Sequence, residues 1–320
     1  MQITFIEKSN IDTSRYDNCV NNALFECFYA QRYVLDALSS NWGICVYGDY
    51  EVVLPVAIGK KFIFKYIYQP VFTQYSAFLS QTTIADNVKD GMIDYLKRKF
   101  LHIHLGLGNA RPGSYTSRDT FLLYLGKNSQ ELNAGFSKQC RKNIKNCISN
   151  NVEIHDSGNC DIHLNLSFEL YARKNVKDVT RAKLYQLSVM LKEAMNTNKA
   201  ELYIAFSNEI PIASAIFVRL KKKYIIYSAT SETGRRNNAM YGIIHMFISR
   251  HTGEDAFLDF AGSSIDTIAY RNRNFGAEKT SYQHLCYSKL RDKINIFDLS
   301  LSITLLYSMV GSWRKISLIP

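Results

Sequence analysis

Residues 200–229 read AELYIAFSNEIPIASAIFVRLKKKYIIYSA, and this segment decides the fold. It contains three runs rich in apolar, β-branched and aromatic residues, joined by short connections, and this pattern predicts antiparallel strands. A helix with apolar residues on one face is expected before them, over 181–196. A second helix and a further strand follow, so the segment predicts an α+β unit with a mixed, mostly antiparallel sheet flanked by helices. The expected strands cover 200–205, 212–220, 224–229 and 256–260, and the second helix covers 238–250.

The first half of the chain shows a similar order of elements, without a residue-level repeat. A chain of 320 residues is also long for one ordinary core. Because the composition changes after Gly126, we expect two domains, 1–127 and 128–320, the second including a basic helix at 134–150 and a C-terminal helix. In the first domain we expect strands at 3–7, 43–47, 50–58, 62–68, 102–105 and 120–125, and helices at 16–38 and 84–98.

Composition and charge are those of a folded protein with anionic partners. Hydrophobic residues make up 47% and charged residues 21%, which excludes a disordered chain. Lysine and arginine outnumber the acidic residues by 39 to 28, giving a net charge of +11. This excess favours phosphate-bearing partners, including RNA, coenzyme A, a diphosphate-linked sugar or an anionic membrane, and does not choose among them. A basic surface that serves only solubility is the alternative.

Cysteine usage and the chain ends bear on the compartment. The seven cysteines are scattered and form no CxxC pair, as expected for buried thiols in a reducing environment. The opening MQITFIEKSN lacks the pattern of a secretory signal, so we expect a cytoplasmic protein without a membrane span. The apolar segment 294–310 is interrupted by Asp298 and serines, and is expected to form a terminal helix docked on the second domain. A membrane-surface helix is the alternative.

Residues 136–147, FSKQCRKNIKNC, predict an amphipathic helix. Apolar residues fall on one face, and four cations form a stripe on the other that can meet an anion with charge and donors. A solvated helix face is the alternative. The apolar residues are Phe136, Cys140, Ile144 and Cys147, and the cations are Lys138, Arg141, Lys142 and Lys145.

Two further segments follow strands of the second unit. The loop TSETGRRNNAMYG (230–242) enters a helix, and its backbone N–H groups with Arg235 and Arg236 are suited to hold a diphosphate; a polar loop with an asparagine N-cap is equally compatible. In FLDFAGSS (257–264), Asp259 ends an apolar strand beside the hydroxyls of Ser263 and Ser264, at the strand end where ligands commonly bind.

Three segments together resemble a known family: CRKNIKNC (140–147), FLDFAGSS (257–264) and RNRNFGA (271–277). In order and spacing they are similar to the Fem-type peptidoglycan aminoacyltransferases and their acetyltransferase-like relatives, a branch of the GNAT superfamily. The similarity covers mainly residues 130–285. It implies two GNAT-like domains in tandem, and transfer of an acyl or aminoacyl group from an activated carrier to an amine, such as a cell-wall or polysaccharide precursor.

Candidate roles for individual residues follow partly from the resemblance and partly from what amine acylation requires. Asp259 is the candidate base or acceptor-orienting residue, although a strand-end aspartate paired with Arg273 would be structural. The donor is expected to be acyl-CoA or aminoacyl-tRNA, used as a co-substrate and not tightly bound. The candidate donor-binding residues are Gly234, Arg235, Arg236 and Asn237, and the candidate substrate-binding residues are Tyr68, Gln69, Thr73, Gln74, Arg141, Lys145, Arg271 and Arg273.

The sequence departs from the family pattern in two places. The family often has a lysine in the pair that Arg271 and Asn272 occupy, which weakens the aminoacyl-tRNA interpretation. The acetyl-CoA pyrophosphate motif is incomplete, because Arg235 and Asn238 occur without the second glycine, so the donor stays open.

A second class of function competes with transfer: a non-catalytic module that binds phosphate or RNA on a degenerate scaffold. DNA is not expected as a partner, and the sequence does not indicate the oligomeric state. His102 and His104 share a strand face, but no cysteine or acidic residue at ligand spacing completes a site, so we interpret them as structural and expect no metal. Motifs of common hydrolases and P-loop enzymes are absent.

Overall fold

The structure, a computed structural model, describes residues 2–262 and 266–289. The terminal helix expected at 294–310 and the hydroxyls of Ser263 and Ser264 lie outside the described residues. Within the described ranges, no helix has both the length and the apolar character needed to cross a bilayer.

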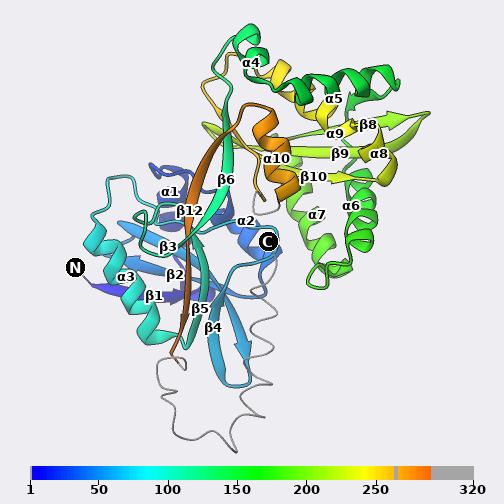
Figure 1. Ribbon diagram of the computed structural model, residues 1–320. Helices are drawn as coiled ribbons and strands as arrows, with labels where there is room; N and C mark the ends of the chain where they lie inside the picture. Colours follow the sequence, from blue (N-terminus) through cyan, green and yellow to red (C-terminus); the bar gives the residue numbers. More distant parts are fainter. Residues whose placement is uncertain (1, 263–265, 290–320) are drawn as a thin grey trace, which may run out of the picture.

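Twelve strands of the described chain form one continuous mixed sheet (Figure 1). They are β1 (Ile3–Glu7), β2 (Trp42–Tyr47), β3 (Val52–Lys61), β4 (Phe64–Tyr68), β5 (His102–Leu107), β6 (Thr116–Tyr124), β7 (Glu153–Asp156), β8 (Ala200–Ser207), β9 (Ile210–Arg219), β10 (Lys223–Thr230), β11 (Phe257–Asp259) and β12 (Glu278–Ser288). Their order across the sheet is β1-β2-β3-β4-β5-β12-β6-β11-β10-β9-β8-β7. Only the pairs β4–β5 and β10–β11 are parallel, so the predicted α+β class with a mostly antiparallel sheet is confirmed.

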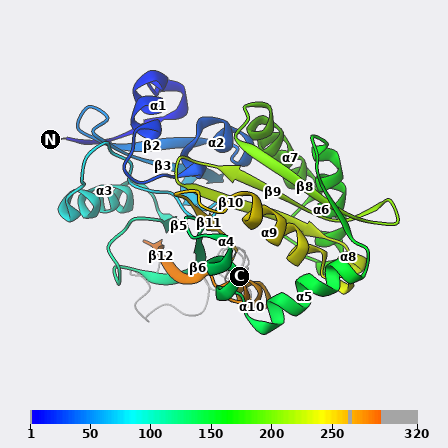
Figure 2. The ribbon, with the colours of Figure 1, turned by 90° about the horizontal axis from the view of Figure 1, so that it is seen from above.

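Helices cover both faces of the sheet, which Figure 2 shows for the second half. In β8, Leu202 and Ile204 join the core with α7, whereas Tyr203 and Ala205 face the core with α9. Both sides of this strand are therefore buried, which explains its nearly continuous apolar sequence. The helices are α1 (Thr13–Asn21), α2 (Arg32–Leu38), α3 (Asp86–Lys99), α4 (Ser129–Gly135), α5 (Lys138–Ser149), α6 (Cys160–Lys174), α7 (Arg181–Asn196), α8 (Glu232–Arg236), α9 (Ala239–Arg250) and α10 (Asp266–Asn274).

Strand β12 joins the two halves of the chain. It lies between β5 and β6 and is antiparallel to both, so that Gln283 is opposite Leu107 on one side and Ser117 on the other. β6 in turn pairs with β11 of the second half. The last strand of the described chain thus completes the sheet of the first half, and the division into domains 1–127 and 128–320 stays a prediction.

The helix expected over 16–38 is wrong as a single element. The structure has α1 and α2 with a short 3-10 turn, Phe28–Ala30, between them. The backbone N–H of Leu24 donates to the carbonyl of Ser80, a tertiary bond that a continuous helix would not leave available. The helical spacing of Leu24 is also misleading, because this side chain is 68% exposed.

Candidate active site

Asp259 ends β11 as a buried carboxylate, with only 1% of the residue exposed. Its Oδ1 accepts a 2.7 Å hydrogen bond from the Thr120 hydroxyl and a 3.0 Å bond from the backbone N–H of Ala261. Its Oδ2 has no hydrogen-bond partner within the described part of the chain, and the Lys223 ammonium lies 4.0 Å from it. One carboxylate oxygen is therefore held in place, while the other is buried beside Lys223 without a hydrogen bond from the described residues.

The surroundings of Asp259 change its affinity for a proton. Burial raises the pKa of the carboxyl, and the nearby Lys223, the Thr120 hydroxyl and the Ala261 N–H lower it by smaller amounts. A carboxyl whose pKa is shifted upward towards neutrality is a better proton acceptor than an exposed one. The expected role of Asp259 as a base is chemically compatible with this site.

Four tyrosines surround this carboxylate. Burial, and among lesser causes the charge of Asp259, raise the pKa of each ring hydroxyl, so all four stay protonated at neutral pH. The rings of Tyr75 and Tyr282 have centroids 5.4 Å apart, and those of Tyr29 and Tyr75 are 5.5 Å apart. The tyrosines are Tyr29, Tyr75, Tyr227 and Tyr282. Tyr29, Tyr75 and Tyr282 belong to the buried core and Tyr227 packs against it, so the carboxylate lies beside a packed region that is apolar in its rings and polar at its hydroxyls.

A chain of hydrogen bonds connects the two halves at this point. The Tyr29 hydroxyl donates to Gln74 Oε1 (3.3 Å), and Gln74 Nε2 donates to Thr120 Oγ1 (3.3 Å). Thr120 then donates to Asp259. The candidate site thus lies at the junction between the first and second halves, where β6 pairs with β11.

Beside Asp259 the sheet opens. The parallel pairing of β10 with β11 ends at Ile225 and Asp259, whereas β10 continues to Thr230. Among the described residues, the last part of β10 therefore has no sheet neighbour on the β11 side. Helices α8 and α10 follow β10 and β11 in the chain. A split between parallel strands of this kind exposes backbone groups that a ligand can use.

Cations gather at the open end of β10. Arg173 Nη2 donates to the Thr230 carbonyl at 3.0 Å. Burial lowers the pKa of Lys174, and the neighbouring charges of Arg173, Arg235 and Arg271 lower it further. Glu232 offsets part of this charge, since it lies 3.7 Å from Arg173 and 3.4 Å from Arg235.

Arg271 is the most buried member of this cationic cluster. Burial lowers its pKa to about 10. Within residues 2–262 and 266–289, no carboxylate forms an ion pair with Arg271 or Lys174. Cations brought together and partly dehydrated without enough acids form a site for an anion. We call Arg173, Lys174, Arg235 and Arg271 the β10 cation cluster.

The predicted donor loop lies in this region. Gly234 packs so tightly that a Cβ would overlap the Ile212 carbonyl, and its N–H donates to the Ser231 hydroxyl at 3.0 Å. Arg236 is 77% exposed on its side chain and pairs with Glu232 at 3.7 Å, while Asn237 accepts a bond from Asn150. Of these residues, Arg235 contributes to the β10 cation cluster.

Of the four candidate substrate-binding residues between positions 68 and 74, only Gln74 joins the hydrogen-bond chain that leads to Asp259. Gln69 accepts from the backbone N–H of Gly106 (2.9 Å) and donates to Thr73 (2.5 Å), which shapes the turn. Tyr68 is half-buried and hydrogen-bonds Ser40.

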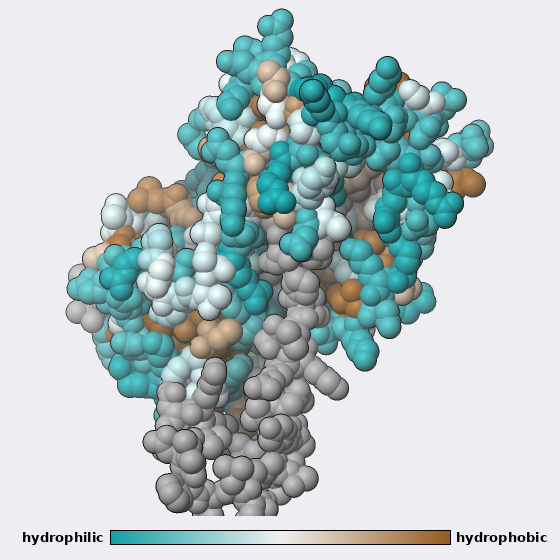
Figure 3. Space-filling model, in the orientation of Figure 1, coloured by the Kyte–Doolittle hydropathy of each residue, from teal (hydrophilic) through white to brown (hydrophobic). Residues whose placement is uncertain are grey.

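The amphipathic helix expected at 136–147 is present as α5, with its apolar residues buried and its cations exposed. Figure 3 shows a hydrophilic surface in the region of this helix. Arg141 Nη1 donates to the carbonyls of Asn133 (3.2 Å) and Phe136, at the C-terminal end of α4. Arg141 thus has a capping role, Lys145 faces solvent, and substrate binding by either stays a prediction.

Asp259 does not pair with Arg273, the alternative that would have made it structural. Its cation is Lys223, whereas the guanidinium of Arg273 lies over the Phe121 ring, 5.9 Å from its centre. Arg271 donates to the Asn272 side chain at 3.3 Å. Sequence reasoning missed Lys223 and the tyrosines, although β-strand alternation places Lys223 and Tyr227 on the face that Asp259 shares.

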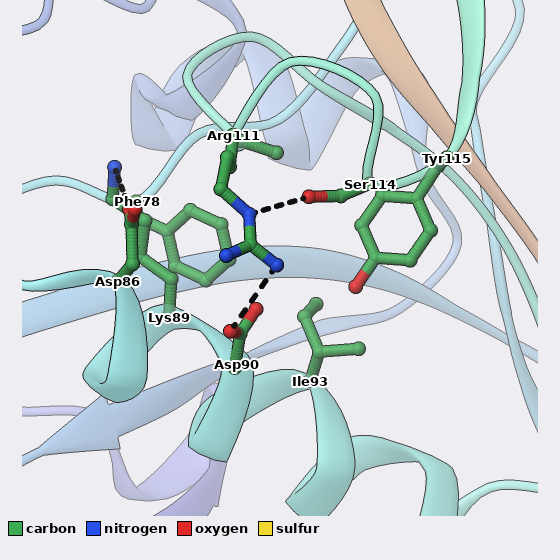
Figure 4. Close-up of a pocket in the computed structure, with 9 residues that line it drawn as sticks. Phe78, Asp86, Lys89, Asp90, Ile93, Arg111, Ser114 and Tyr115 are labelled. Carbon is green, nitrogen blue, oxygen red and sulfur yellow. Dashed lines mark hydrogen bonds and ion pairs between the residues drawn. The ribbon is translucent and has the colours of Figure 1, made fainter.

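A separate shallow depression lies beside α3 (Figure 4). The Arg111 side chain occupies it, 3.9 Å from Asp90 and 3.4 Å from the Ser114 hydroxyl. No residue of the candidate active site lines this depression, so the two are separate.

Solved structures share this architecture. The crystal structure of FemX is 12% identical, with a TM-score of 0.62, covering 92% of this chain and all of that one. The C-terminal domain of a putative lysylphosphatidylglycerol synthetase from Agrobacterium fabrum is 9% identical, with a TM-score of 0.57, covering 93% of this chain and 95% of that one. A tandem GNAT protein from the clavulanic acid biosynthesis pathway is 11% identical, with a TM-score of 0.50, covering 88% of this chain and 97% of that one.

These comparisons define the class of fold. The chain has a Fem-like tandem GNAT fold, so the resemblance drawn from three short segments is confirmed at the level of the fold. No protein-family model and no curated protein sequence matches the chain.

Proposed function

We propose that this protein is an N-acyltransferase that moves an acyl or aminoacyl group from a phosphate-bearing carrier to an amine. The main support is the buried Asp259 carboxylate, which keeps one oxygen without a hydrogen-bond partner beside an open split in the sheet. The Fem-like tandem GNAT fold agrees with this class of reaction, since FemX and GNAT proteins share it.

In the proposed reaction the amine nitrogen attacks the acyl carbonyl carbon. A new C–N bond forms, the C–S bond of a thioester or the C–O bond of an ester breaks, and the leaving sulfur or oxygen takes up one proton. The amine loses one proton to Asp259 Oδ2, so protons balance over the cycle. Holding the two reactants in line supplies much of the rate increase in such a reaction.

The donor is proposed to enter beside the end of β10, with its phosphates on the β10 cation cluster. Arg271 is suited to phosphate because guanidinium donors bind two oxygens at once. Acyl-CoA and aminoacyl-tRNA both carry such phosphates. The acceptor amine is proposed to bind between Gln74 and the four tyrosines, because these side chains lie near Asp259.

The first experiment compares Asp259→Asn with the unmodified protein. Asparagine keeps an acceptor for Thr120 and Ala261 but cannot take the amine proton, so turnover should fall about 10²–10⁴-fold. Donor binding should persist, and the melting temperature should fall, because Lys223 loses the charge of its partner; the thermal transition shows whether the variant is still folded. A fully active Asp259→Asn variant would show that the base is another group.

The second experiment tests the donor. Acyl-CoA or aminoacyl-tRNA should raise the melting temperature, because a ligand of the folded state stabilises it. Arg271→Met should weaken that shift, whereas the control Lys192→Met should not, since Lys192 is exposed and pairs with Asp161 at 2.7 Å. No shift with any donor contradicts the proposal. RNA binding with steep salt dependence and no turnover would favour the non-catalytic module instead.

A further inference from the structure

Two histidines and a cysteine meet on β5 and β12. The side-chain donor atoms of His104, His284 and Cys286 all lie within 4.8 Å of one another. The two imidazole rings have centroids 4.3 Å apart, and the Cys286 sulfur is 3.4 Å from His284 Nδ1. The strand register creates this group, because Cys286 is directly opposite His104 and His284 is two residues before it on the same face.

The ring nitrogens of this cluster are unusual for a buried site. Both nitrogens of His104 and the Nε2 of His284 are buried and lack a hydrogen-bond partner in the part of the chain that the structure covers. Buried polar groups normally have partners, and a buried one left without a partner costs about 1–3 kcal/mol. A bound cation would supply the missing partner for both rings.

Cys286 differs from the other cysteines. It is exposed, whereas the remaining six are buried, so its thiol is the one that solvent and ions reach. Burial raises the pKa of the buried thiols, to about 12 for Cys27 and Cys140, which keeps them protonated. A thiolate ligand for a metal would therefore come from Cys286.

We propose that His104, His284 and Cys286 bind a Zn²⁺ ion, with the fourth position open to water or another ligand. Two imidazoles and one thiolate are a ligand set that zinc favours. In a tetrahedral zinc site the ligand atoms are roughly 3.3–3.8 Å apart, as follows from the usual Zn–N and Zn–S lengths. This inference does not depend on the proposed acyl transfer.

The experiment titrates the full-length protein with Co²⁺ as a spectroscopic substitute for Zn²⁺. Binding of about one equivalent should give a thiolate-to-cobalt charge-transfer band in the near ultraviolet, and Zn²⁺ should displace it. Cys286→Ser should abolish that band. His104→Ala and His284→Ala should each weaken binding at least ~10-fold.

Matched variants separate this site from others. His102→Ala removes a histidine from the same strand outside the cluster and should leave the band and the affinity unchanged. Melting temperatures without metal show whether each variant is folded, and Zn²⁺ should raise that of the unmodified protein. Absence of the band, or a band that survives Cys286→Ser in a folded protein, would overturn the proposal.

Discussion

The Thr120 hydroxyl donates a 2.7 Å hydrogen bond to the Asp259 carboxylate and so connects β6 with the end of β11. Both residues are buried, at 5% and 1% exposed. The same Thr120 oxygen accepts a hydrogen bond from Gln74, so one hydroxyl links Gln74 to the proposed base, Asp259.

Thr120→Val should shift the pH dependence of activity. The Thr120 bond lowers the pKa of Asp259, so its loss raises that pKa and moves the acidic limb of the rate profile to higher pH. The lost bond should also reduce the free energy of unfolding by about 1–3 kcal/mol. Rate profiles and urea unfolding measure the two effects. Thr120→Ser retains the hydroxyl and serves as the control; an unmoved limb in Thr120→Val would contradict the role of this bond.

Gly106→Ala should displace the backbone that positions Gln74 and Tyr75. A Cβ at this position would overlap the Gln74 carbonyl and lie 3.0 Å from Cα of Tyr75, and backbone atoms cannot rotate away. We expect a loss of about 1–3 kcal/mol in the free energy of unfolding, together with reduced turnover. In the control Gly135→Ala, the added methyl meets nothing within 4 Å, so stability should stay the same or rise by up to ~1 kcal/mol. Equal free energies of unfolding for the two variants would contradict this prediction.

His163 should make the protein acid-sensitive. It is 3% exposed, and burial lowers its pKa from 6.5 to about 4. Because the folded pKa is depressed, the stabilisation is complete above pH 6.5 and is lost as pH falls towards 4, by roughly 3 kcal/mol from this residue.

Urea unfolding between about pH 7 and about pH 4.5 measures this effect, since stability follows the difference in bound protons. His163→Gln should give a flatter pH dependence, whatever its absolute stability. An equally steep curve for the variant would assign the acid sensitivity to other groups.

Residues 1–127 should not fold when expressed alone. In this fragment β5 lacks its partner β12, and β6 lacks both β11 and β12, so three unpaired strand edges expose backbone groups. Thermal unfolding by circular dichroism should show no cooperative transition for this fragment. Co-expression with residues 128–320 should restore a soluble complex. A cooperative transition in the isolated fragment would instead support an autonomous first domain.

The sequence predicted the elements whose pattern is local. The β8–β10 meander and α9 appear where they were expected, because their apolar runs are long and their connections short. The α5 helix could be predicted for the same reason, since Cys140, Ile144 and Cys147 follow its 3.6-residue period and are buried.

Elements that depend on distant partners were missed. β12 buries Gln283 and His284 next to each other on opposite faces, so it shows no alternation of apolar and polar residues. Helix α6 was also missed, because it buries polar residues such as His163, whose ring nitrogen lies 3.0 Å from the Ser214 hydroxyl of a distant strand.

The candidate site was predictable only in part, for a related reason. Asp259 and Gln74 could be predicted as site residues from their local motifs. Lys223 could not, because it lies within a run of three lysines whose pattern is typical of an exposed turn. His104 and Cys286 are far apart in sequence, so only the pairing of β5 with β12 shows that they meet.

The position of β12 has a consequence for synthesis on the ribosome. β5 and β6 leave the exit tunnel early, but the strand that fills the space between them is among the last described segments to be made. Until residues 278–288 have been made, the nascent chain carries open strand edges on β5 and β6, and unpaired edges favour association with other chains. The sheet can therefore close only after residues 278–288 have been synthesised, long after the strands on either side of β12.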